Sequence, residues 1–94
     1  MAIRSFRPRS PKAIFDGVVP KGVSIALAKA GRRKLNMLEA AGALDDLKSP
    51  PGNGLHALTG DRKGQHAIKV NDQYRVCFRW TAAGPEDVEI VDYH

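Results

Sequence analysis

The sequence predicts an α+β domain in which an N-terminal strand and two helices pack on one face of a mainly antiparallel sheet of four to five strands. Residues 20–42 carry apolar side chains at helical spacing, and residues 55–92 contain four short runs in which apolar and polar residues alternate. A Pro/Gly-rich loop at residues 49–54 joins the helical half to the strand half. Because this loop is too short to separate two domains, we expect residues 1–94 to form one domain with a single modest core.

The helical half begins with an extended segment and contains two helices. Residues 3–7 are a candidate for a short basic strand that ends at a proline. Ser10 and Pro11 favour the start of a brief helix that runs to about residue 15. The main helix is predicted from about residue 20 to Gly42, a residue type that often stops a helix. Its narrow apolar stripe consists of Ser24, Leu27, Ala28, Gly31, Leu35, Leu38 and Gly42.

The strand half follows a short helical turn that is predicted at residues 44–47. Strands are predicted over residues 55–58, 64–70, 74–80 and 88–92, because turn residues separate these runs. Antiparallel pairing of consecutive strands is expected from the short connections.

The register of the central hairpin follows from its turn. A three-residue turn at residues 71–73 pairs Ile68 with Val76, whereas a two-residue Asn-Asp turn would pair Ile68 with Arg75 and mix the faces. We therefore expect one apolar face packed on the helices and one open, basic face. The apolar face carries Ile68, Val70, Tyr74, Val76, Phe78 and Trp80, and the opposite face carries Lys69, Arg75, Cys77 and Arg79.

The composition favours a polyanion as partner. Fifteen Lys and Arg against ten Asp and Glu give a net charge of +5, and a basic surface attracts phosphate-rich partners through counterion release. A generic solubilising surface or an acidic partner protein would account for the same charge. No apolar run approaches the roughly 20 residues of a membrane span, so no membrane partner is expected. A single cysteine predicts a cytoplasmic protein without an internal disulfide.

The strongest chemical signal is the run Asp92, Tyr93 and His94. It follows a predicted strand, so Asp92 and His94 are expected to project from one face and Tyr93 from the other. An imidazole titrates near neutral pH, and RNA cleavage without a metal needs a base for the 2′-hydroxyl, an acid for the 5′-oxygen and cations around the phosphate. A solvated chain end is the alternative interpretation. If the trio is functional, the sheet is expected to place it over a basic floor of Lys69, Arg75 and Arg79.

His56 is a second candidate for proton transfer. It precedes a polar loop bounded by glycines, which supplies Arg62 and Lys63 beside the imidazole. An ordinary β-turn with solvated charges is the commoner meaning of such a loop. The three histidines and one cysteine lack the spacing of metal ligands, so neither a metal nor a cofactor is expected.

The central hairpin offers one more candidate. Arg75 could clamp a phosphate through two parallel hydrogen bonds, or it could be a surface residue that pairs with Glu89 or Asp92. His66 alternates with the apolar set and is interpreted as a residue at the edge of the core. Cys77 is interpreted as a small packing residue.

Taken in order, these residues resemble the HigB toxins, the killer proteins of plasmid-maintenance type toxin–antitoxin systems within the RelE-like superfamily. The resemblance covers essentially the whole chain and is tightest from residue 55 onward. The motifs that carry it are residues 55–64 (LHALTGDRKG), 68–71 (IKVN), 74–78 (YRVCF) and 92–94 (DYH), together with residues 3–6 and 15–17 near the start.

The resemblance implies a RelE-like microbial RNase fold. It also implies that the protein cleaves mRNA in the A site of translating ribosomes and so inhibits translation. A further implication is a HigA-like antitoxin that contains a helix-turn-helix. The toxin would then contact operator DNA only indirectly, through this antitoxin. His56, Arg75, Asp92, Tyr93 and His94 match the family's catalytic set. The expected RNA- and phosphate-binding residues are Arg62, which matches a basic position nearby, and Lys63, Lys69 and Arg79.

One position departs from the family's pattern. Thr59 stands where some relatives carry a lysine, three residues after the first histidine. Phosphate stabilisation at that point would fall to Arg62, Lys63 or Arg75.

Two other functions fit the same chain. A toxin on the same fold could act without nuclease activity, as the gyrase-poisoning ParE relatives do, since fold alone does not define function. A plain basic nucleic-acid-binding module would explain the charge. The proton-handling residues favour the nuclease, because a protein that only binds or blocks has no need of them.

Overall fold

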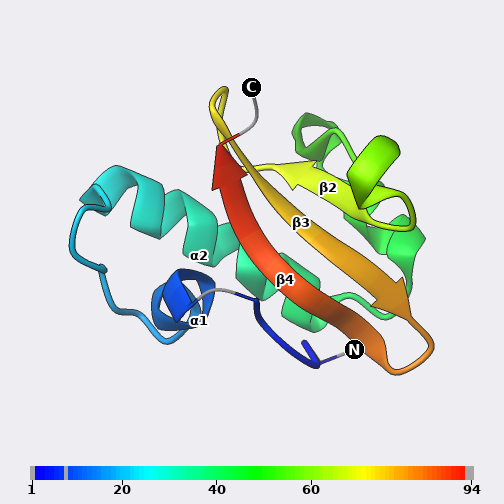
Figure 1. Ribbon diagram of the computed structural model, residues 1–94, viewed down its shortest axis with the longest axis horizontal. Coiled ribbons are helices and arrows are strands. Elements are labelled where there is room, and N and C mark those ends of the chain that lie inside the picture. The colour runs from blue at the N-terminus through cyan, green and yellow to red at the C-terminus, as the bar shows by residue number, and fades with distance from the viewer. Residues whose placement is uncertain (1, 8, 93–94) are drawn as a thin grey trace.

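The computed structural model describes residues 2–7 and 9–92, with the side chains of Arg9 and Ser10 left aside. Two α-helices come first, α1 (Arg9–Phe15) and α2 (Ile25–Ala40), and short 3-10 turns follow at η1 (Leu44–Lys48), η2 (Pro51–Asn53) and η3 (Gly60–Arg62). The strands are β1 (His56–Ala57), β2 (His66–Lys69), β3 (Tyr74–Thr81) and β4 (Gly84–Asp92) (Figure 1). The predicted α+β class and the order of the elements are confirmed.

The main helix begins later than predicted. Ser24 is its N-cap rather than a member of the apolar stripe, because the Ser24 side chain accepts a hydrogen bond from the Leu27 N–H at 3.0 Å. The helix ends at Ala40, two residues before Gly42. The Asp46 carboxylate then accepts hydrogen bonds from the N–H groups of Gly42 and Ala43, at 2.9 and 3.1 Å, and holds the chain in its turn toward η1.

The sheet is antiparallel with the order β1-β2-β3-β4 in the described part of the chain. The predicted hairpin register is confirmed, since Ile68 lies opposite Val76 and His66 opposite Phe78. β1 is only two residues long, shorter than predicted. β4 is longer, and its ladder with β3 shifts between Cys77 and Arg79.

The N-terminal segment is extended but pairs with the sheet at a single bridge, between Phe6 and Val88. Arg4 donates its N–H to the Pro85 carbonyl at 2.7 Å, and Val88 donates to the Ser5 carbonyl at 3.1 Å. The Ser5 hydroxyl also accepts from the N–H of Asp87, which has a positive φ of 55° at the irregular part of β4. The predicted fifth strand is therefore reduced to one bridge, because the irregularity of β4 interrupts a regular ladder.

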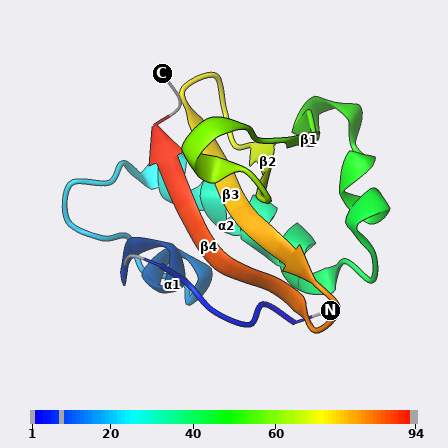
Figure 2. The same ribbon diagram turned by 45° about the vertical axis from the view of Figure 1, so that its right-hand side comes forward.

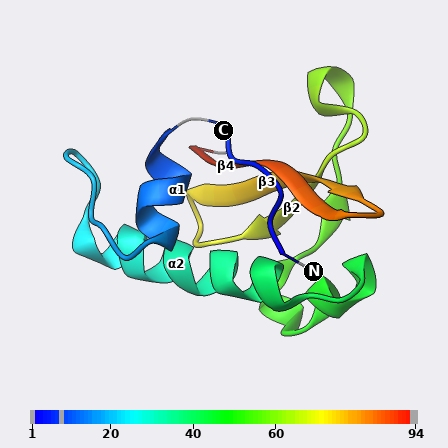
Figure 3. The ribbon, with the colours of Figure 1, turned by 90° about the horizontal axis from the view of Figure 1, so that it is seen from below.

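The core lies between α2 and one face of the sheet, and α1 packs beside α2 at the β4 edge (Figure 3). Gly31 permits this close approach: a Cβ built at this position lies 3.1 Å from Ile90 Cδ1 and 3.6 Å from Ile14 Cγ2. The most deeply buried apolar residues are Ile14, Leu35, Leu38, Leu47, Ile68, Val76, Phe78 and Val88. The apolar face predicted from the hairpin is thus the core face.

The other face of the sheet, called here the outer face, carries η3 and the loop around it but no described α-helix (Figure 2). A small apolar cluster of Leu58, Ala67 and Cys77 lies beneath this loop, with Val91 packed against it. Within residues 2–7 and 9–92, neither helix is long and apolar enough to cross a membrane.

Candidate active site on the outer face

Strand pairing places the candidate residues in transverse rows on the outer face. His56 lies opposite Ala67, Ala67 opposite Cys77, and Cys77 opposite Glu89. Residues directly opposite one another in a sheet share a face, so this row runs from His56 to Glu89. Two residues along the strands, a second row contains Lys69, Arg75 and Val91. The outer face thus brings His56 and Arg75 onto one surface, with Cα positions about 12 Å apart from ordinary strand spacings.

The His56 imidazole contacts a backbone carbonyl two residues earlier in the chain. Its Nδ1 lies 2.8 Å from the carbonyl oxygen of Gly54, and the side chain is exposed. A carbonyl can only accept a hydrogen bond, so Nδ1 carries the proton and the neutral ring has its lone pair on Nε2. Gly54 has a φ of 56°, in the left-handed region that favours glycine. The local turn therefore prepares His56 to accept a proton at Nε2.

Glu89 is the centre of the charge network on this face. It is 8% exposed, and its carboxylate accepts two hydrogen bonds from Arg62, at 3.1 and 3.4 Å. Arg7 from the N-terminal segment contacts the same carboxylate at 3.4 Å. The hydrogen bond to Glu89 raises the pKa of the Arg62 guanidinium. Arg62 also donates to Gln65 Oε1 at 3.2 Å, so it ties the loop after β1 to the sheet.

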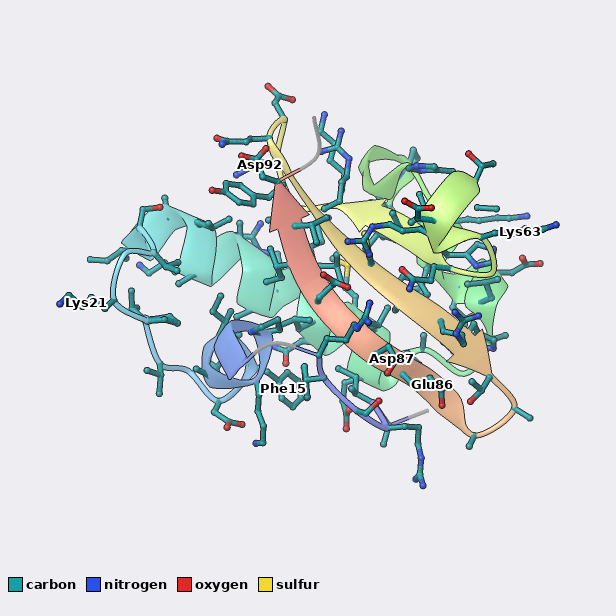
Figure 4. All side chains as sticks on the ribbon, viewed as in Figure 1. Phe15, Lys21, Lys63, Glu86, Asp87 and Asp92 are labelled. Atoms are coloured by element: carbon teal, nitrogen blue, oxygen red, sulfur yellow. The ribbon has the colours of Figure 1, made fainter. Side chains whose placement is uncertain are left out.

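Arg79 also contacts this loop, at its end. Its Nη1 donates to the Gly64 carbonyl at 3.4 Å. Gly64 has a φ of 93°, in the left-handed region that favours glycine, and a Cβ there would lie 2.6 Å from Arg79 Nη1, so a side chain would strain the backbone and displace the guanidinium. Lys63 is exposed and extends from the loop into solvent (Figure 4). Among the cations predicted to bind phosphate, Arg62 and Arg79 therefore position the loop, and Lys63 presents its charge outward.

The second row is organised by the β2–β3 turn. Arg75 Nη1 donates to the carbonyls of Asn71 and Tyr74, at 2.6 and 3.1 Å, which holds the guanidinium at the turn end of the outer face. Lys69 forms an ion pair with Asp72 at 2.9 Å. This ion pair lowers the pKa of the Asp72 carboxyl. Lys69 and Arg75 lie directly opposite one another, so this end of the face concentrates positive charge.

Asp92 is not on the face where we expected it. It lies opposite Tyr74 in the β3–β4 ladder, on the side of the sheet that carries the core, whereas Arg75 lies opposite Val91. The prediction that Lys69, Arg75 and Arg79 form a basic surface beneath Asp92 is therefore wrong, because these three residues project from the other face.

Asp92 accepts a hydrogen bond from Gln73 Nε2 at 2.9 Å, at the tip of the β2–β3 turn (Figure 4). Tyr93 and His94 lie outside the described residues.

Two further interpretations are confirmed by packing. Cys77 is fully buried, and burial raises the pKa of its thiol, so it is a packing residue. His66 is half-buried and stacks on Phe78, with ring centroids 6.3 Å apart. Among the described residues, no group of three or more His, Cys, Asp or Glu could hold a metal ion.

Glu89 and Arg7 have roles that the sequence prediction missed. Glu89 was considered only as a partner of Arg75, but it binds Arg62 and Arg7 instead. A usable signal was present, because a carboxylate between Val88 and Ile90 in an apolar strand must either face solvent or find cations. Its partners are 27 and 82 residues away in the chain, so no local pattern could have identified them.

The arrangement places the His56 imidazole on the same face of the sheet as the guanidinium groups of Arg75 and Arg79. The imidazole can accept a proton at Nε2, and fixed cations nearby can stabilise negative charge on a phosphate. This is half of the machinery for cleaving a phosphodiester at a ribose 2′-hydroxyl; an acid for the leaving oxygen is the other half.

The comparisons with known proteins identify the family of the chain. Residues 6–94 match the family described as the RelE-like toxin of type II toxin-antitoxin system HigB. Toxin HigB-1 of Vibrio cholerae is 44% identical over 63 residues, which cover 67% of this chain and 62% of that protein. An uncharacterized protein of Haemophilus influenzae is 39% identical over 54 residues, covering 57% of this chain and 54% of its own length. The matched region thus spans less than two thirds of each relative. The family match over nearly the whole chain, on the α+β fold described above, places the chain in the HigB-like family of RelE-like toxins of type II toxin–antitoxin systems.

Proposed function

We propose that this toxin is an endoribonuclease that cleaves mRNA on translating ribosomes and so inhibits translation. The observation that carries the proposal is the His56 imidazole, whose Nδ1 is committed to the Gly54 carbonyl and whose Nε2 is therefore the basic nitrogen. It shares the outer face with Arg75 and Lys69. A growth inhibitor that acts only by binding would not need a prepared proton acceptor.

In the proposed reaction, His56 Nε2 accepts the proton of a ribose 2′-hydroxyl, and the 2′-oxygen attacks the adjacent phosphorus. The bond from phosphorus to the 5′-oxygen breaks, and an acid protonates that oxygen as it leaves. Arg75 stabilises the charge on the phosphate oxygens, with Lys69 beside it. His94 is proposed as the acid and Tyr93 as a stacking or hydrogen-bonding contact for a splayed nucleotide. Asp92 receives no role in this scheme, because its register places it on the core side of the sheet.

The products follow from this bond making and breaking. The upstream fragment ends in a 2′,3′-cyclic phosphate and the downstream fragment in a 5′-hydroxyl. No metal ion enters the reaction as proposed, so cleavage is expected to persist in a chelator. The proposed partners are the ribosomal A site with its mRNA and a HigA-like antitoxin, in the cytoplasm.

The test compares the parent chain with His56→Ala and His94→Ala. Each change is expected to lower cleavage of ribosome-bound mRNA by about 100-fold or more, the usual contribution of a general acid or base, and to relieve growth arrest. Mapping of RNA ends should find 5′-hydroxyl groups within translated codons. If both variants still arrest growth and still cleave mRNA on ribosomes, the assignment is wrong.

The matched control is His66→Ala, which removes an imidazole from the core side of the same sheet. It is expected to lower stability, because the ring stacks on Phe78, but to retain cleavage per folded molecule. Growth arrest without RNA cleavage, accompanied by linear DNA from trapped gyrase, would instead identify a toxin of the ParE kind.

A further inference from the structure

A second surface of the molecule has features that the proposed nuclease does not use. Val18, Val19 and Ile25 are the large apolar side chains that stand exposed in the described residues, at 53%, 46% and 64%. All three line one surface hollow of about 200 Å³ between α1 and the start of α2. Single exposed apolar residues are common, but three around one hollow indicate a binding site for another molecule.

Cations surround this hollow. Lys29 lies one helical turn after Ile25 and lines the hollow with Arg32. Arg32 is held in place by a hydrogen bond from its Nε to the Phe15 carbonyl, at 3.4 Å. Lys21 extends from the tip of the connecting loop (Figure 4). The nearby carboxylate of Asp16 is paired with Lys12 at 2.9 Å, so the rim of the hollow is positive.

We propose that this surface, the α1–α2 patch of Val18, Val19 and Ile25 with Lys21, Lys29 and Arg32, binds an acidic amphipathic segment of the antitoxin. Aliphatic anchors in the hollow would supply most of the affinity, and carboxylates at the rim would meet the cations. An RNA backbone would use the cations but leave the three aliphatic side chains uncovered. The proposal rests on the antitoxin that membership of a type II family implies, and not on RNA cleavage.

A second copy of this chain is the other possible occupant. Docking two such patches face to face would bring their lysines and arginines together, which opposes self-association. The patch also lies at the opposite end of the molecule from β1 and η3 (Figures 1 and 3). No residue of the patch is among the proposed catalytic residues.

The test uses the full chain and its cognate antitoxin, with binding measured by calorimetry in the absence of ribosomes. The double variant Val18→Asp with Ile25→Asp is expected to weaken the antitoxin affinity by at least 100-fold, because it places carboxylates among apolar contacts. Lys29→Glu is expected to weaken it by about 10-fold and to flatten its salt dependence. The control Ala82→Asp, exposed on the β3–β4 turn, should bind as the parent does.

Two further readouts separate this inference from the proposed nuclease activity. In cells, the double variant should still arrest growth and should no longer be rescued by the antitoxin. A photo-cross-linking residue at Val19 should attach to the antitoxin in the assembled complex, and one at Ala82 should not. Unchanged antitoxin affinity in the double variant, or a complex that forms without a cross-link from position 19, would overturn the proposal. A concentration-dependent dimer abolished by the double variant, with antitoxin binding intact, would assign the patch to a second copy instead.

Discussion

Removal of the Arg62 guanidinium should destabilise the fold more than an ordinary surface substitution does. Glu89 is 8% exposed and makes its closest ionic contact with Arg62, at 3.1 Å. In the Arg62→Ala variant, the carboxylate keeps only the contact with Arg7 at 3.4 Å among the ion pairs described above. A buried charge without an adequate partner is costly, and its carboxylate has little access to water.

The size of the effect can be worked out from the burial of each partner. Breaking a fully buried ion pair costs about 3–5 kcal/mol. The Arg62 side chain is 36% exposed and Arg7 remains, so we expect a loss of about 2 kcal/mol in the free energy of unfolding. For a chain of 94 residues this corresponds to a fall of roughly 10 °C in Tm.

The assay is urea denaturation followed by circular dichroism. Lys63→Ala, at the exposed neighbouring position, is the matched control and should change stability by no more than about 0.5 kcal/mol. The double variant Arg62→Ala with Glu89→Leu should recover most of the lost free energy of unfolding, because it removes the buried Glu89 carboxylate together with its partner. The explanation fails if Arg62→Ala alone stays within about 0.5 kcal/mol of the parent, or if the double variant is no more stable than the single one.

Three other predictions concern packing, capping and pH. Gly31→Ala gains about 1 kcal/mol of helix propensity but brings a Cβ to 3.1 Å from Ile90 Cδ1. The gain in unfolding free energy should therefore appear in the Ile90→Val background and be small or absent in the parent; equal gains in both would contradict the packing argument. Ser24→Ala removes the cap that accepts the Leu27 N–H and should cost about 1 kcal/mol, measured by thermal unfolding. A loss below about 0.3 kcal/mol would show that water replaces the cap. Burial holds the pKa of the Cys77 thiol above its ordinary value of 9.0, so the unfolded chain ionises first as pH rises. Stability from this source is intact below pH 9 and is lost above it. Urea unfolding between pH 8 and about 10 should show a steeper decline for the parent than for Cys77→Ala, and parallel curves would refute the linkage.

Much of the fold was predictable because its signals are local. The 71–73 turn and the alternation around it predict the register of β2 and β3, and the structure confirms it. The helical spacing after Ser24 predicts the helix that covers the core, although Ser24 itself proved to be the cap. The candidate strand at residues 3–7 is extended but pairs at a single bridge, because it meets β4 at its irregular part.

The candidate site shows where such local signals fail. Ile90 and Val91 are both apolar, so alternation alone does not say which of them faces the core. Both are packed, Ile90 against the main core and Val91 against the small cluster on the outer face. Ile90 on the core side assigns Asp92 to that side as well, away from Arg75.

The sequence by itself determined the family, the α+β class, the basic character of the central hairpin and the identity of the candidate catalytic residues, because composition, periodicity and motif are properties of neighbouring residues. Only the tertiary structure decided which of those residues share a face and which cations are already engaged. Arg62 and Arg7 lie far apart in the chain but meet at Glu89. Nδ1 of His56 is directed to the Gly54 carbonyl by the turn before it. The contacts at Glu89 depend on strand pairing and loop closure over long sequence distances, which local residue patterns do not encode.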